Sequence, residues 1–95
     1  MIVYINGYLI NNEDDFHNEL SKALNLSKHY GKNLDALWDV LTSDVDRPVT
    51  VVWKDSQTSL IKMGQVFIEI TEIFEKVKEQ DMGFGLNDIF DYILK

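Results

Sequence analysis

The sequence contains no cysteine, only one proline and only five glycines in 95 residues. Without cysteine the chain has neither a disulfide framework nor thiolate ligands for a metal, which fits a reducing compartment. No apolar stretch approaches the roughly 18–20 residues that a membrane-spanning helix requires. Residues 1–4 lack the basic segment of a secretory signal. We therefore expect a cytoplasmic protein that makes no membrane contact and folds without covalent staples.

Positive charge is also scarce. Nine Lys and Arg residues face sixteen Asp and Glu residues, and the formal net charge is −7 at pH 7. Such a chain repels phosphate backbones, so direct binding to nucleic acid is not expected. An acidic surface attracts basic proteins and accelerates their encounter. The same charge also suits an ordinary soluble domain, so composition alone does not identify a partner.

Hydrophobic residues make up 45% of the chain, which is enough for a sizeable core. The length predicts one domain over residues 1–95. Apolar patterns and turn signals predict strands over residues 1–5 and 49–53 and helices over residues 13–25, 33–43 and 65–80, with a short further helix ending at residue 63. Residues 89–94 form either a strand or a short helix, and the alternation of Phe90, Tyr92 and Leu94 favours a third strand. Strands separated by helices favour an α/β fold, here a three-stranded parallel sheet packed against about four helices.

The ends of the later helices are predicted from local signals. Ser56 or Thr58 is a candidate cap for the short helix, and Gly64 would end it. The helix over residues 65–80 carries an apolar stripe, which consists of Phe67, Ile70, Phe74 and Val77. Residues 81–87 include two glycines and are expected to form a loop. His17 is expected either to pack within the first helix or to lie on its surface.

The helix predicted over residues 33–43 carries two stripes. Its apolar face consists of Leu34, Leu37, Trp38 and Leu41 at helical spacing. Asp35 and Asp39 lie roughly 40° apart around the axis, with Thr42 on the same side. Two like charges at this spacing cost an isolated helix a few tenths of a kcal/mol. The fold gains nothing evident from this repulsion, whereas a cationic partner would be attracted by the two carboxylates. Trp38 either packs in the core or is partly exposed at an interface.

This region resembles the barstar family of intracellular ribonuclease inhibitors. The similarity rests on Tyr30-Gly31, the run Asn33-Leu34-Asp35-Ala36-Leu37-Trp38-Asp39, Leu41-Thr42, and scattered matches at Ile5-Asn6-Gly7, His17, Leu20, Leu24, Leu26, Val45, Pro48, Trp53, Phe74 and Lys78. It extends over most of residues 1–80, and the last 15 residues match poorly. The resemblance implies a sheet-and-helix inhibitor that binds 1:1 to a small basic ribonuclease and is a monomer when free.

The resemblance also implies which residues contact the ribonuclease. In the family, the acidic helix and the preceding loop block the active site, and carboxylates meet the basic residues that would hold RNA phosphate. The expected partner-binding residues are His29, Tyr30, Asn33, Asp35, Trp38, Asp39, Thr42, Ser43, Asp44 and Asp46. His29 is either such a contact or an ordinary exposed residue of the loop. Carboxylates accept paired hydrogen bonds from Arg, and a helix already holds them in place.

Several of these positions depart from the family pattern. His29, Ser43 and Asp44 replace a Tyr, a Gly and an aromatic residue, while Asp46 keeps an acid. Arg47 replaces another aromatic residue, and Lys76 replaces an acidic contact, although Glu75 is adjacent. The acidic centre is therefore kept and the rim is altered. Because the rim tunes partner choice and association rate, we expect a barstar-like inhibitor with a shifted partner.

Two other functions stay open from the sequence. The chain would serve equally as an acidic interaction module that binds a different basic protein without inhibiting a nuclease. Asp35 and Asp39 would also serve a small hydrolase, but only if a concave pocket surrounded both carboxylates. Two isolated His residues and no Cys give no metal-ligand spacing. We therefore expect no catalytic residues, no cofactor and no metal.

Overall fold

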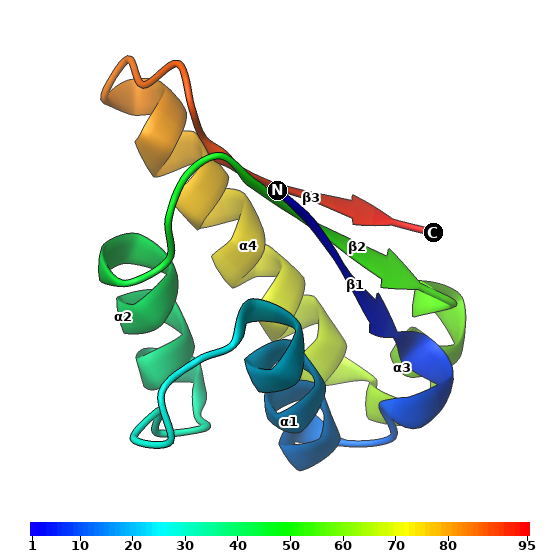
Figure 1. Ribbon diagram of the computed structural model, residues 1–95. Helices are drawn as coiled ribbons and strands as arrows, with labels where there is room; N and C mark the ends of the chain where they lie inside the picture. Colours follow the sequence, from blue (N-terminus) through cyan, green and yellow to red (C-terminus); the bar gives the residue numbers. More distant parts are fainter.

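The computed structural model describes residues 1–95 and shows three parallel strands joined by helices (Figure 1). The strands are β1 (Ile2–Asn6), β2 (Val49–Lys54) and β3 (Phe90–Leu94), in the sheet order β1-β2-β3. The helices are the 3₁₀ helix η1 (Gly7–Leu9), α1 (Glu13–Leu24), α2 (Leu34–Ser43), α3 (Ser56–Met63) and α4 (Gln65–Gly83). The predicted α/β class, with a three-stranded parallel sheet and four α-helices, is confirmed.

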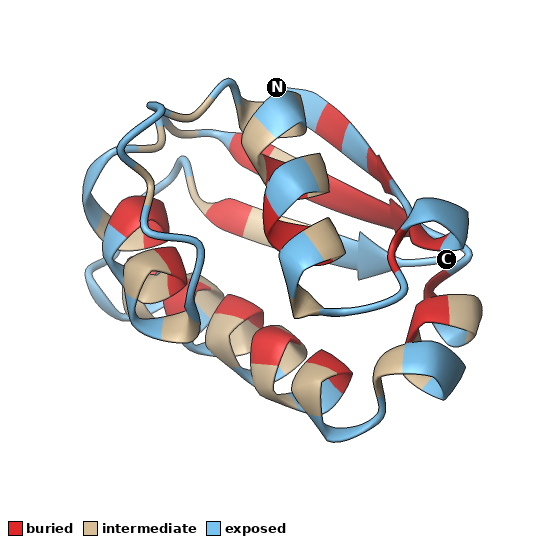
Figure 2. Cartoon of the chain, turned by 90° about the horizontal axis from the view of Figure 1, so that it is seen from below, coloured by how far each residue is buried: buried red, intermediate tan, exposed pale blue.

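The core lies between one face of the sheet and the helices. Figure 2 shows buried residues on the strands and on the helix sides that face inward. Trp53, at the centre of this core, stacks on Phe16 with ring centroids 5.1 Å apart and packs against Phe67 at 4.8 Å. Its indole N–H donates to the Ser59 hydroxyl over 3.1 Å. This layer fixes how α1 and α4 sit on β2.

Strand β2 is the central strand, and its register with both neighbours is parallel. Val51 lies opposite Val3 on one side and Tyr92 on the other. Val49, Val51 and Trp53 are fully buried, as a β-branched central strand should be. None of the helices combines the length and the apolar character that crossing a membrane demands.

Asparagine side chains cap the starts of the first two α-helices. The Asn12 side-chain oxygen accepts the Asp15 backbone N–H, and the Asn33 oxygen accepts the Ala36 N–H, each over 2.8 Å. These bonds satisfy donors that a helix start leaves free. At the other end of α1, Asn25 adopts the left-handed conformation that ends helices.

Two predicted helix ends are wrong. Neither Ser56 nor Thr58 caps α3, because Asp55 occupies the cap position in a left-handed conformation and makes no side-chain cap bond. Helix α4 continues to Gly83 instead of ending near residue 80, so Asp81 is helical and buried. The extra turn is stabilised by hydrogen bonds that the Asp81 carboxylate accepts from Arg47 and Phe90, distant contacts that the local sequence does not reveal.

Candidate partner-binding site

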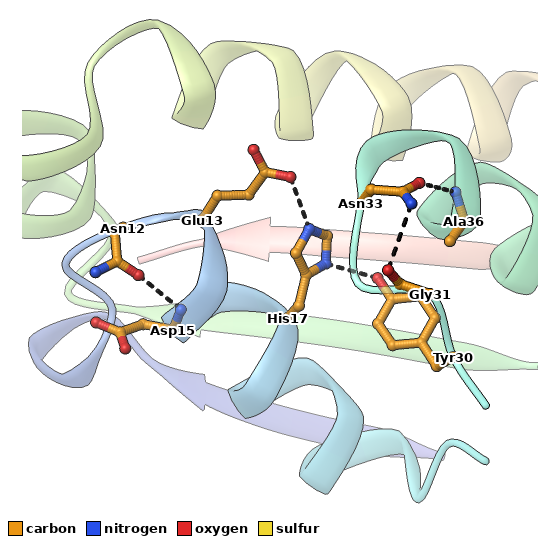
Figure 3. A network of polar contacts seen from close by, with 8 residues as sticks. All are labelled: Asn12, Glu13, Asp15, His17, Tyr30, Gly31, Asn33 and Ala36. Carbon is orange, nitrogen blue, oxygen red and sulfur yellow. Dashed lines mark hydrogen bonds and ion pairs between the residues drawn. The ribbon is translucent and has the colours of Figure 1, made fainter. Parts of the chain in front are cut away.

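Helix α2 and the loop before it present the predicted site residues. Asn33 fixes the junction, since its oxygen caps α2 while its side-chain N–H donates to the Gly31 carbonyl over 3.4 Å (Figure 3). Beyond this cap the apolar stripe turns inward, with Leu37, Val40 and Leu41 buried. Asp35 and Asp39 both lie exposed. The two-sided character predicted for this helix is confirmed.

Trp38 lies between the two sides of α2. It is half-buried and packs against the hydrophobic core. Part of its ring therefore stabilises the fold, and part faces solvent beside the exposed acids. Both roles expected for this residue are compatible with this position.

Four exposed carboxylates lie on or just after α2 and have no partner within the chain. They belong to Asp35, Asp39, Asp44 and Asp46, and none takes part in an ion pair or accepts a hydrogen bond from another group. Asp44 is the cap residue at the carboxyl end, and the last turn of α2 contains no basic residue. The carboxyl end of a helix carries negative partial charge. Asp44 therefore adds charge where the helix already disfavours it.

A groove of about 930 Å³ separates the carboxyl-terminal half of α2 from the loop that follows α1. Its apolar lining includes Leu24, Leu26, Val40 and Val45. Its polar lining includes His29, Tyr30, Asp39, Ser43, Asp44 and Asp46. An apolar lining with carboxylates beside it suits a side chain that has an aliphatic stem and a cationic head.

The groove also bears on the hydrolase hypothesis. Asp39 lines it, whereas Asp35 does not. The two carboxylates therefore do not converge in one pocket, which is what an acid–base pair acting on a common substrate requires. This geometry suits contact with a second surface better than catalysis.

A buried polar network holds the wall of the groove. The His17 ring, fully buried in α1, contacts the Tyr30 hydroxyl through Nδ1 at 2.7 Å and the Glu13 carboxylate through Nε2 at 2.9 Å (Figure 3). Both contacts are satisfied when Nε2 carries the proton of a neutral ring and Tyr30 donates to Nδ1. Burial, with a further contribution from the charge of Glu13, raises the pKa of Tyr30. The phenol therefore stays protonated and able to donate.

The remaining predicted residues surround this wall. His29 lies exposed in the loop, and its backbone N–H donates to the Ser27 hydroxyl over 3.1 Å. The hydroxyls of Thr42 and Ser43 donate back to the carbonyls of Trp38 and Asp39. These bonds run back to the carbonyl one turn earlier, as hydroxyls of Ser and Thr within helices commonly do. A partner would therefore meet the hydroxyls as acceptors, not as donors.

Sequence reasoning missed one pair that secures this end of the molecule. The Arg47 guanidinium donates to the two oxygens of Asp81 over 2.8 and 3.3 Å and to the Val45 carbonyl over 2.7 Å. Asp81 also accepts the backbone N–H of Phe90 over 2.7 Å. Burial acts to raise the pKa of Asp81, but the hydrogen bonds from Arg47 and Phe90 and the charge of Arg47 outweigh it, and the pKa is lowered.

This pair changes the interpretation of the altered rim. The Arg47 side chain is only 16% exposed and is engaged within the chain, so it is not a free rim cation. Glu75 accepts a hydrogen bond from the Tyr92 hydroxyl over 2.8 Å, whereas Lys76 is exposed. No local sequence signal links Arg47 with Asp81, which lies 34 residues away.

Comparison with known proteins identifies relatives over nearly the whole chain. Residues 1–88 match the sequence model of the Barstar family, described as "Barstar (barnase inhibitor)". The chain is also 33% identical over 93 residues to a protein of Bacillus subtilis strain 168 named "Putative ribonuclease inhibitor YrdF". That alignment covers 98% of this chain and 97% of the relative. Both matches include the whole of α2, the preceding loop and the groove.

Proposed function

This chain belongs to the barstar family of ribonuclease inhibitors, and from that premise we propose that it binds 1:1 to a small basic ribonuclease and blocks the active site. One observation carries the proposal. Asp35, Asp39, Asp44 and Asp46 are exposed and lack partners within the chain. Carboxylates held in this way are available to the cations of another protein.

The mechanism is steric and electrostatic blockade without chemistry. A ribonuclease that binds RNA needs cations for the phosphates, and the carboxylates of α2 would occupy those cations in place of the substrate. Asp39 has the central position, because it lies on the exposed face of α2 and also lines the groove. The net charge of −7 would speed encounter with a basic enzyme. We expect the inhibitor to act in the cytoplasm of the cell that makes the ribonuclease, and to be a monomer when free.

Partner choice would lie at the rim. Asp44 and Lys76 are both exposed and differ in chemistry from the residues that the family pattern favours at these positions. The double variant Asp44→Trp with Lys76→Glu should therefore bind barnase-type enzymes more tightly than the natural chain does. Unchanged affinity would show that these two positions do not set specificity.

The direct test is a titration of the protein into barnase and other small basic ribonucleases while RNA cleavage is followed. We expect stoichiometric suppression by the natural chain and its loss in Asp39→Ala. Asp14→Ala is the matched control, since Asp14 is another exposed acid, lies in the first turn of α1 and does not line the groove, and its removal changes the net charge equally. Binding without suppression of RNA cleavage would favour the acidic interaction module. Binding to none of these ribonucleases would overturn the proposal.

A further inference from the structure

Three large apolar side chains lie exposed where α4 connects to β3. Met82 is 57% exposed, Phe84 70% and Leu86 46%, and we call these three residues the apolar tip. The chain has five Phe residues, and the other four are at most 6% exposed. A Phe in water gives up the free energy that burial of a large apolar side chain would supply. The fold itself therefore leaves most of the Phe84 side chain in solvent.

The backbone of the apolar tip forms a defined turn that ends α4. Gly85 has a positive φ of 71°, and its N–H donates to the Met82 carbonyl over 3.0 Å. The Leu86 N–H donates to the Asp81 carbonyl over 3.2 Å. These two bonds, with a left-handed glycine between them, are the Schellman arrangement that closes a helix. Side chains on such a fixed backbone lose little conformational entropy when they dock.

The apolar tip is tied directly to the proposed ribonuclease-binding face. Asp81 immediately precedes Met82, and its carboxylate is held by Arg47. Arg47 in turn donates to the carbonyl of Val45, which lines the groove. Figure 1 shows the connection between α4 and β3 at the end of the molecule toward which the chain rises after leaving α2. Arg47 therefore bonds both to Asp81, the residue next to the apolar tip, and to the backbone of Val45 at the groove.

The size of a stable interface also favours including the apolar tip. A standard interface covers about 800 Å² on each partner, a patch of roughly 16 Å radius. Helix α2 has ten residues and is about 15 Å long, and the whole chain measures 36 × 27 × 22 Å. A patch of this size centred on the carboxyl-terminal half of α2 must extend onto neighbouring elements. The end of α4 is such a neighbour.

We propose that the apolar tip is a second anchor for the same ribonuclease and docks on a nonpolar patch beside its basic groove. This inference rests on the proposed function. A second copy of this chain is a poor occupant, because it would bring the acids that follow α2 close to like charges. The carboxylates would then govern the association rate, and the apolar tip would govern the lifetime of the complex and the choice of enzyme.

The test compares two exposed apolar residues on different parts of the molecule. Phe84→Ala removes the centre of the apolar tip, and Ile61→Ala removes a side chain on α3 that is 75% exposed. Association and dissociation rates are measured against the tightest-binding member of a panel of small basic ribonucleases that includes barnase. We expect Phe84→Ala to raise the dissociation rate at least tenfold with little change in the association rate. Ile61→Ala should stay within twofold of the natural chain.

Each other outcome has a distinct meaning. If Phe84→Ala behaves like Ile61→Ala while Asp39→Ala still abolishes inhibition, the inference is overturned and the proposed function stands. If the natural chain inhibits no ribonuclease of the panel, the proposed function fails and this inference fails with it. If light scattering shows a dimer that Phe84→Ala converts to a monomer without changing affinity for the enzyme, the occupant is a second copy and the inference is again overturned.

Discussion

Two groups of acids in this chain, chosen from its sixteen, differ in whether the fold gives them partners. In one group every carboxylate has a partner within the chain: Glu13 with His17, Glu75 with Tyr92, Asp81 with Arg47, and Asp91 with Lys78. In the other group, on and after α2, none has: Asp35, Asp39, Asp44 and Asp46. The first group stabilises the molecule, and the second adds repulsion to it. Acids that a fold leaves unmatched at one place are the ones to examine for an external partner.

The largest effect that separates the two groups should come from Asp81→Ala. This change would leave the Arg47 guanidinium and the Phe90 N–H without their shared partner in a site where Asp81 is 4% exposed. Removing one member of a buried ion pair costs about 3–5 kcal/mol. Urea unfolding should show this loss in the free energy of unfolding.

The control for that variant is Asp88→Ala. Asp88 is an exposed acid in the adjoining connection and has no partner within the chain, so its removal should change stability by no more than about 0.5 kcal/mol. Equal losses in both variants would show that net charge, not the contact with Arg47, determines the result. The distinction between the two groups of acids would then lose its main support.

Tyr30→Phe, at the wall of the groove, is expected to lower the free energy of unfolding by a smaller amount. The change removes the hydroxyl that contacts Nδ1 of the fully buried His17 and leaves that nitrogen without a partner. An unsatisfied buried polar atom costs about 1–3 kcal/mol. Tyr8→Phe is the matched control, because the Tyr8 hydroxyl is exposed and makes no hydrogen bond. Similar unfolding curves for the two variants would mean that the network does not hold the loop.

Much of the site could be predicted because its signals are local. The Asn33 cap, the apolar stripe and the exposed acids of α2 are set by spacing along one helix, so they follow from helical periodicity. The parallel sheet follows in the same way from strands that alternate with helices. The resemblance to the barstar family added the role of that helix, which spacing alone does not supply.

The parts that were missed depend on contacts between distant segments. Asp81 lies beside two glycines that suggested a loop, but Arg47 and Phe90 hold it in a helix. His17 gave no sign that it would bridge Glu13 and a loop residue thirteen positions later. The apolar tip likewise has an ordinary composition, and only the exposed fractions of its side chains distinguish it.

Low pH should reduce the stabilisation that the first group of carboxylates provides, through protonation of Asp81. Its pKa is lowered in the folded state, so the stabilisation is complete above the unfolded pKa of about 3.9 and is lost as the pH falls through the folded pKa. The difference in unfolding free energy between the natural chain and Asp81→Asn should therefore shrink below about pH 4. A series of urea titrations from pH 7 downward measures it. A difference that stays constant with pH would place the role of Asp81 in packing rather than in charge.

The smallest effect, and one of opposite sign, should come from Asp39→Asn in the free protein. Asp39 repels Asp35 one turn earlier in α2, so removing its charge should raise the free energy of unfolding by about 0.2–0.5 kcal/mol. Asp14→Asn is the counterpart, because Asp14 lies in the first turn of α1, where the helix favours negative charge. That change should lower stability by a similar amount. Both differences should fade in 1 M salt, which screens charges beyond about 3 Å. If Asp39→Asn instead lowered stability, its carboxylate would contribute to the fold, and the second group would lose its central member.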